Sequence, residues 1–374
     1  MTEVTRRQWI AAGGVVLAEA CGRKKATGYD GYALVATSGD DTLAVVDLTA
    51  FKLVKPIHLG APPTALVAGP LESRTYVLSG STGTVHIVDR NLNRAASRKV
   101  ADELFDIAMA PDGKHVVAIA TGGRELIVID GSSLQVVRRH NLEAQPIGLD
   151  IASSQHAAVS SGEHGVVELL NLKNGQHVRT RLSGRIGAVR FRRDGALLLV
   201  ANLHDRLLTA LEIPSLRVVA DLPVAMQPDN LCFNSDGGQL FVSGAGMDGV
   251  AIVFPYNTLE VEQTVLAGRS PGVMACSETP GYLFVASRNA SDVCIFDITT
   301  RKMIGIVETG GVPGHMAITP DSQYALVLAE KSGDMAVIHI PAIRGNKWKS
   351  GASLFTIIPV GDKPVDLAIM PREV

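Results

Sequence analysis

Polar side chains recur at one position of a repeating pattern, where a short apolar segment begins. The eight equivalent positions are Ala65, Asp106, Gly148, Ala188, Asn230, Val273, His315 and Asp366. His315 and Asp366 fall in consecutive repeats, so we expect the imidazole and the carboxylate to be neighbours. A histidine oriented by a carboxylate can titrate near neutral pH and can bind a metal or other ligand. The sequence therefore predicts a ligand site that contains His315, Asp366, Asp106 and Asn230.

Charged residues in the turns of the same repeats are expected on the same face. His204, Arg206 and Arg288 lie in glycine-, serine- or asparagine-rich turns between apolar runs. With the four residues above they would surround a polar pocket for a small anion or cofactor, in which Arg206 or Arg288 meets negative charge. The alternative is a solvated rim of compensating charges. Both interpretations stay open.

Known catalytic motifs do not occur in the sequence. It has no Cys-x-x-Cys-His, His-Glu-x-x-His, P-loop or Gly-x-Ser-x-Gly segment, and its ten histidines are dispersed. Residues 244–249 match G-x-G-x-x-G, but an apolar strand-like run follows where a dinucleotide site needs a helix, so we expect a hairpin turn. No catalytic residue or metal site is assigned, and any cofactor is unknown.

The elements that would position these residues come from an internal repeat. Short apolar runs start at 32, 75, 115, 157, 197, 240, 282 and 324, which is a spacing of roughly 42 residues. Each is followed by a turn, a second alternating strand that often ends in aspartate, a third strand, a proline and a fourth apolar stretch. Four short strands per repeat predict the blade of a β-propeller.

The phase of the repeat predicts how the ring closes. The chain enters the pattern at a second strand, near residue 32, and ends at 364–371 with a first strand. The last segment should therefore supply the innermost strand of the first blade. We predict an all-β fold with eight four-stranded antiparallel blades, with seven blades as the alternative.

The repeats resemble the YVTN β-propeller family. The matching segments include residues 324–327, 84–89 and 360–364, and the resemblance covers 30–374. It implies a propeller, often exported, and says little about activity. Some relatives in the wider group are redox enzymes, including the eight-bladed haem-binding domain of cytochrome-cd-type nitrite reductase, which is an analogy of architecture.

The first residues are typical of an export signal. Residues 1–20 contain Arg6 and Arg7, then a short apolar run and small residues, which resembles a twin-arginine signal peptide. Residues 21–29 would form a short linker and 30–374 a single propeller domain. Ala-Glu-Ala-Cys at 18–21 resembles a lipobox, which would lipidate Cys21, although ordinary cleavage after Ala20 stays open. We expect a periplasmic or outer-surface protein.

Cysteine content and charge limit the remaining choices. Cys232, Cys276 and Cys294 lie in apolar strand-like runs, so we expect buried thiols, with one bridge possible. The chain has 374 residues, of which 35 are Lys or Arg and 37 are Asp or Glu, and this balance argues against nucleic-acid binding.

Three classes of function fit these patterns. The first is an exported protein, expected to be monomeric, that binds a protein partner or small ligand on the top face of the ring. The second is a cofactor-associated redox or tetrapyrrole-handling enzyme, and the third is an envelope scaffold. A membrane would be contacted only through a lipid on Cys21.

Overall fold

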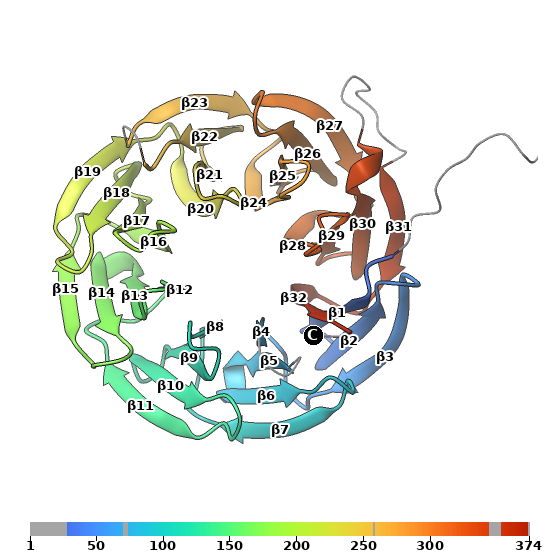
Figure 1. The fold of residues 1–374 in the computed structure, drawn as a ribbon, viewed down its shortest axis with the longest axis horizontal. Helices are drawn as coiled ribbons and strands as arrows, with labels where there is room; N and C mark the ends of the chain where they lie inside the picture. Colours follow the sequence, from blue (N-terminus) through green and yellow to red (C-terminus); the bar gives the residue numbers. More distant parts are fainter. Residues whose placement is uncertain (1–27, 70–73, 257–258, 344–352, 373–374) are drawn as a thin grey trace, which may run out of the picture.

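The protein is a closed ring of eight radial β-sheets in the computed structural model, which describes residues 28–69, 74–256, 259–343 and 353–372. Each sheet has four antiparallel strands, and the innermost strands surround the ring axis (Figure 1). The eight-bladed prediction is confirmed and the seven-bladed alternative is wrong. The arrangement follows from the alternating pattern, because a single sheet leaves two apolar faces uncovered and radial packing covers both.

Each blade repeats one strand order from the axis outward. The innermost strands are β4 (Ala65–Gly69), β8 (Asp106–Met109), β12 (Gly148–Ile151), β16 (Ile186–Phe191), β20 (Gln227–Phe233), β24 (Pro271–Cys276), β28 (Pro313–Ile318) and β32 (Pro364–Pro371). The second strands are β1 (Gly31–Thr37), β5 (Arg74–Ser79), β9 (His115–Ala120), β13 (His156–Ser161), β17 (Leu197–Asn202), β21 (Leu240–Ala245), β25 (Tyr282–Ser287) and β29 (Tyr324–Ala329).

The two outer layers follow in the same order. The third strands are β2 (Thr42–Asp47), β6 (Thr84–Val88), β10 (Glu125–Asp130), β14 (Val166–Asn171), β18 (Leu207–Glu212), β22 (Gly249–Val253), β26 (Asp292–Asp297) and β30 (Asp334–His339). The outermost strands are β3 (Lys52–His58), β7 (Arg94–Lys99), β11 (Val136–Asn141), β15 (His177–Arg181), β19 (Val218–Pro223), β23 (Val261–Leu266), β27 (Lys302–Glu308) and β31 (Leu354–Pro359). Three single-turn 3-10 helices complete the described elements, η1 (Gly80–Thr82), η2 (Gly162–His164) and η3 (Ile340–Ala342).

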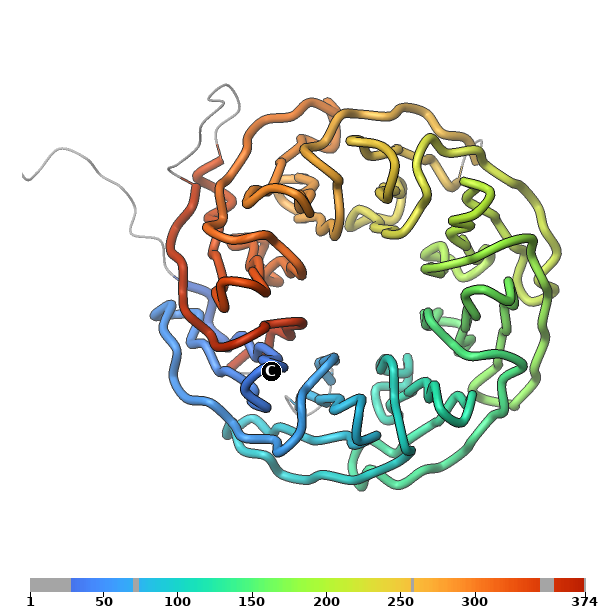
Figure 2. Tube along the Cα trace, turned by 180° about the vertical axis from the view of Figure 1, so that it is seen from behind, coloured from blue at the N-terminus to red at the C-terminus, as the bar shows by residue number. Residues whose placement is uncertain are grey.

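The two ends of the propeller meet in one blade. β32 pairs antiparallel with β1, with Leu34 opposite Ala368 and Ala36 opposite Asp366. Figure 2 shows the last strand beside the first strands of the chain. The predicted closure is therefore confirmed, and it fixes the position of Asp366 at the ring axis through hydrogen bonds between the chain ends.

Burial is greatest in the second and third strands and is lower in the outermost strands. β9 and β10 are almost fully buried, whereas most of the outermost β11 is exposed or half-buried. Three of the third strands, β2, β10 and β26, end in an aspartate whose carboxylate closes the next turn, as where Asp47 Oδ1 accepts hydrogen bonds from the amides of Thr49 (2.7 Å) and Ala50 (3.2 Å). These turns make the blades uniform, so the blades differ chiefly in their side chains.

The G-x-G-x-x-G segment is the turn between β21 and β22, as expected. A strand follows it, and Gly246 has a φ of +91°, which favours glycine. Among the described residues, no helix has the length and apolar character needed to cross a membrane.

Candidate functional site

Four polar side chains occupy equivalent positions at the entrance to innermost strands. Asp106 lies opposite Ile119, Asn230 opposite Ser243, His315 opposite Leu328 and Asp366 opposite Ala36. We call this entrance, on the face that carries the connections from outermost to innermost strands, the mouth. The repeat thus places the predicted positions in one ring around the axis.

His315 and Asp366 are in contact across the boundary between two blades. His315 Nε2 lies 3.1 Å from Asp366 Oδ1, and the two side chains are 36% and 16% exposed. The carboxylate also accepts hydrogen bonds from the amides of Leu66 (2.7 Å), on the following blade, and Leu367 (2.8 Å). Burial raises the pKa of Asp366, and the nearby His315 opposes that rise. The imidazole is held by a fixed carboxylate and remains accessible at the mouth.

Asp106 has the same repeat position as Asp366 but no histidine beside it. Its Oδ1 accepts a hydrogen bond from the amide of Ile107 at 2.8 Å. Burial raises its pKa to about 6, and the negative charges of Asp366 and Asp150 add to that rise. The charge of Asp366 therefore affects the pKa of Asp106, although Asp106 lies on a different blade of the mouth.

A second charge pair lies deeper between adjacent blades. Arg190 Nη1 is 3.7 Å from Asp150 Oδ1, and Asp150 Oδ2 accepts a hydrogen bond from the amide of Phe191 at 2.7 Å. Burial raises the pKa of Asp150, and the Arg190 guanidinium opposes this. Asp150 therefore links two blades in the way that Asp366 does.

A cavity of about 270 Å³ opens at the mouth beside Asp106 and Arg190, whereas His315, Asp366 and Asn230 are not among its lining residues. Its walls come from four successive blades and combine apolar side chains with charged ones. The lining residues are Asp106, Ile147, Gly148, Leu149, Arg185, Ile186, Gly187, Ala188, Val189, Arg190, Leu203 and Asp229. Ile147 is 36% exposed, which leaves an apolar surface beside Arg185 and Arg190. An apolar wall with a few convergent polar groups is the usual composition of a small-molecule site.

Asn230 and Arg288 contribute to the mouth in different ways. The Asn230 side-chain nitrogen is buried and makes no hydrogen bond within the described part of the chain. Arg288 forms an ion pair with Asp229, which lines the cavity. An unpartnered buried amide marks a donor that a ligand can use. Sequence reasoning missed Asp229 and Arg185, because neither occupies the repeat position that was compared.

His204 and Arg206 lie on the turn between β17 and β18, and both side chains are exposed. His204 Nδ1 is 2.7 Å from Asp205 Oδ1, so its nearest described partner is the adjacent residue. Leu203, in the same turn, lines the cavity, whereas His204 and Arg206 do not. The structure therefore brings His315 together with Asp366 and places Asp106 in the cavity wall, but leaves these two residues on the rim.

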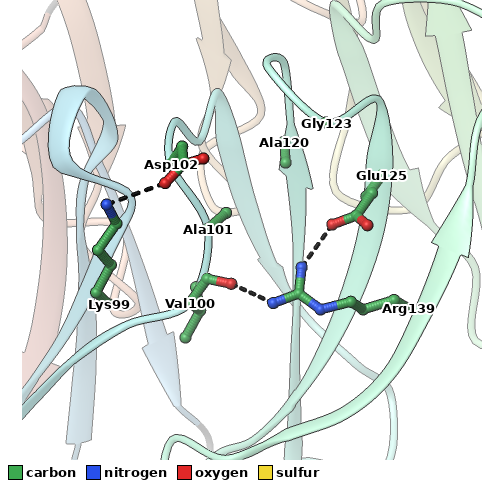
Figure 3. Close-up of a pocket in the computed structure, with 8 residues that line it drawn as sticks. All are labelled: Lys99, Val100, Ala101, Asp102, Ala120, Gly123, Glu125 and Arg139. Atoms are coloured by element: carbon green, nitrogen blue, oxygen red, sulfur yellow. Dashed lines mark hydrogen bonds and ion pairs between the residues drawn. The ribbon is translucent and has the colours of Figure 1, made fainter.

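A second cavity, of about 440 Å³, lies between neighbouring blades away from the axis (Figure 3). Lys99 pairs with Asp102 at 3.0 Å, while Arg139 binds the carboxylate of Glu125 and the carbonyl of Val100 (Figure 3). Its lining contains none of the exposed large apolar side chains found among the described residues, whereas the exposed Ile147 lines the cavity at the mouth. We therefore regard the mouth as the stronger candidate site.

No group of three or more His, Cys, Asp or Glu side chains in the described ranges is arranged to hold a metal ion. Arg6, Arg7 and Cys21 lie outside the described residues, so the export and lipidation predictions are not addressed by the structure.

Comparisons with known proteins give a fold but no family. No family model and no curated protein matches the chain. The solved structure of dihydro-heme d1 dehydrogenase NirN in complex with DHE is similar, with a TM-score of 0.77 and 17% identity over 92% of this chain and 75% of that one.

Two other solved propellers show the same resemblance. A functionally unknown protein from Desulfotomaculum acetoxidans has a TM-score of 0.61 and 13% identity over 91% of this chain and 99% of that one. The C-terminal WD40 domain of Sif2 has a TM-score of 0.64 and 13% identity over 75% and 82%. At these identities the similarity shows the propeller fold alone.

Proposed function

We propose that the protein binds a tetrapyrrole of the haem d1 class at the mouth of the ring. The observation that carries this proposal is the cavity, in which an apolar wall with the exposed Ile147 stands beside Arg185 and Arg190. A tetrapyrrole is a flat apolar macrocycle with acidic substituents. Such a ligand can pack its face on an apolar wall while its carboxylates meet arginine side chains.

The remaining mouth residues match the other parts of such a ligand. His315 is accessible and oriented by Asp366, so its imidazole would meet the metal or the polar centre of the macrocycle. The buried Asn230 amide would donate a hydrogen bond to a ring substituent. The similarity to NirN, whose structure is described as a complex with DHE, supports this ligand class over other flat acidic molecules.

The cellular address belongs to the same proposal. Arg6 and Arg7 would direct export through the twin-arginine route, and Cys21 would carry a lipid after cleavage. Export places a binding protein in the compartment where the mature domain would meet its ligand.

A second candidate function is catalysis on the bound tetrapyrrole. It is favoured by the 3.1 Å contact between His315 and Asp366, because a histidine oriented by a carboxylate can accept a proton from a ligand. If no tetrapyrrole binds, a protein-binding or scaffold role replaces both candidates.

The test is an absorbance titration of the full chain with haem d1 and, separately, iron protoporphyrin IX. We expect saturable spectral changes with haem d1 and at least a tenfold weaker Kd for His315→Ala and Arg190→Ala. Arg217→Ala is the matched control, since Arg217 pairs with Glu212 at 3.2 Å on an exposed surface outside the mouth. Equal affinity in the wild-type protein, both mouth variants and the control would place the ligand elsewhere.

A further inference from the structure

Two cysteines from neighbouring blades face each other directly below the mouth. Cys232 lies in β20, two residues after Asn230, and Cys276 is the last residue of β24. Side chains of a strand point alternately to its two faces. The strand pairings place Cys232 opposite Phe241 and Cys276 opposite Leu283, one repeat position apart. The Cys232 side chain therefore points toward the blade of β24, and the Cys276 side chain points toward the blade of β20. Both lie at the boundary between these two blades.

The two sulfur atoms are already close. Cys232 Sγ lies 3.8 Å from Cys276 Sγ, and both side chains are half-buried against the apolar cluster between these blades. A disulfide requires an S–S distance of ~2.05 Å, so small side-chain rotations must bring the sulfurs together. Cys294 is the contrasting thiol, because it is buried in the interior of the blade.

We propose that Cys232 and Cys276 are a redox-active pair that closes into a reversible disulfide between two blades. The oxidant is a disulfide supplied by another molecule, such as oxidised glutathione or the oxidised form of a thiol–disulfide oxidoreductase. Cys232 thiolate attacks one sulfur of that disulfide and releases a thiolate. Cys276, after losing its proton, attacks the Cys232 sulfur of the mixed disulfide and releases the second thiolate. The protein loses two electrons and two protons, and the oxidant becomes two thiols.

The local electrostatics agree with this order of events. The hydrogen bond with Cys276 and the positive charge of Arg190 lower the pKa of Cys232, whereas the hydrogen bond with Cys232 and burial raise that of Cys276. Burial raises the pKa of Cys294 to about 11, which makes it a poor nucleophile. Closure would hold β20 against β24 just below Asn230, so the redox state would control how rigid this side of the mouth is.

The test uses the full chain with Cys21→Ser, which leaves the three propeller thiols. After incubation with oxidised glutathione, unfolding and alkylation, we expect loss of two alkylation sites and a peptide in which residues 232 and 276 are linked. Dithiothreitol should restore both sites. Oxidation should also raise Tm by several degrees, because the link spans 44 residues of chain.

Three variants separate the pair from the remaining thiol. Cys232→Ser and Cys276→Ser should both give no internal link, and Cys276→Ser should instead carry glutathione on Cys232, the thiol that attacks first. Cys294→Ser should link as the wild-type protein does. In the protein that keeps all three propeller thiols, full alkylation of these thiols, or glutathione on Cys232 without an internal link, would overturn the proposal. None of these readouts depends on tetrapyrrole binding.

Discussion

Two side-chain pairs between adjacent blades use the same backbone hydrogen bond and differ in the basic partner of the aspartate. Asp366 accepts a hydrogen bond from the amide of Leu66 on the following blade, and Asp150 accepts one from the amide of Phe191. The partner of Asp366 is His315, at 3.1 Å, and that of Asp150 is Arg190, at 3.7 Å. Both aspartates link blades, so the two pairs differ chiefly in the basic side chain, an imidazole in one and a guanidinium in the other.

The two members of each pair differ in how exposed they are and in what they bind. The carboxylates are mostly buried and bound to backbone amides, which is typical of groups that fix strand positions. Their basic partners are more exposed, at 36% for His315 and 45% for Arg190, so both can meet a ligand at the mouth. An imidazole can also exchange a proton near neutral pH, whereas a guanidinium supplies a permanent charge.

The largest effect is expected when either carboxylate is removed. Asp366→Ala and Asp150→Ala should each lower the free energy of unfolding by about 2–4 kcal/mol, because amides between blades lose their acceptor. His315→Ala and Arg190→Ala should change it by less than about 1 kcal/mol, since their side chains are partly solvated. Urea unfolding measures both. A stable Asp366→Ala with an unstable His315→Ala would reverse the assigned roles.

A smaller, pH-dependent effect is expected at Asp106, which shares the repeat position of Asp366 without a histidine. Its pKa is about 6 in the folded protein, raised by burial from 3.8, so the folded state binds more protons between these values. Stability should therefore fall as pH rises from 4 to 6. Asp106→Asn should be more stable by about 3 kcal/mol at pH 7 and no different near pH 3.5. Urea midpoints at the two pH values measure this, and an equal change at both would exclude titration of Asp106 as the cause.

The fold was predictable from the sequence because the same pattern occurs eight times. The entry phase near residue 32 and the final strand at 364–371 determine the closing blade, and the structure confirms the pairing of β32 with β1. The contact between His315 and Asp366 followed from their equivalent positions in consecutive repeats, although their role in binding stays a prediction.

The rest of the site depends on departures from the repeat. Asp229 falls at a register shift between Pro228 and Asn230, so the alternation of the strand no longer determines its direction. Arg185 precedes β16 in a connecting loop. The cavity between blades depends on such residues as well as on Arg190, and a comparison of equivalent repeat positions across blades cannot reveal them. The sequence left one bridge possible among Cys232, Cys276 and Cys294 but did not identify the pair, since Cys232 and Cys276 occupy different repeat positions on opposite faces of their strands.

We propose that a tetrapyrrole binds at the mouth and not in the outer cavity of Figure 3. The most direct measurement is anomalous diffraction at the iron edge from crystals of the full chain grown with haem d1. We expect one iron peak at the ring axis, beside His315 and beside the cavity wall that contains Ile147 and Arg190. An iron peak in the cavity lined by Lys99 and Arg139, or no peak in crystals of a protein that binds haem d1 in solution, would contradict it.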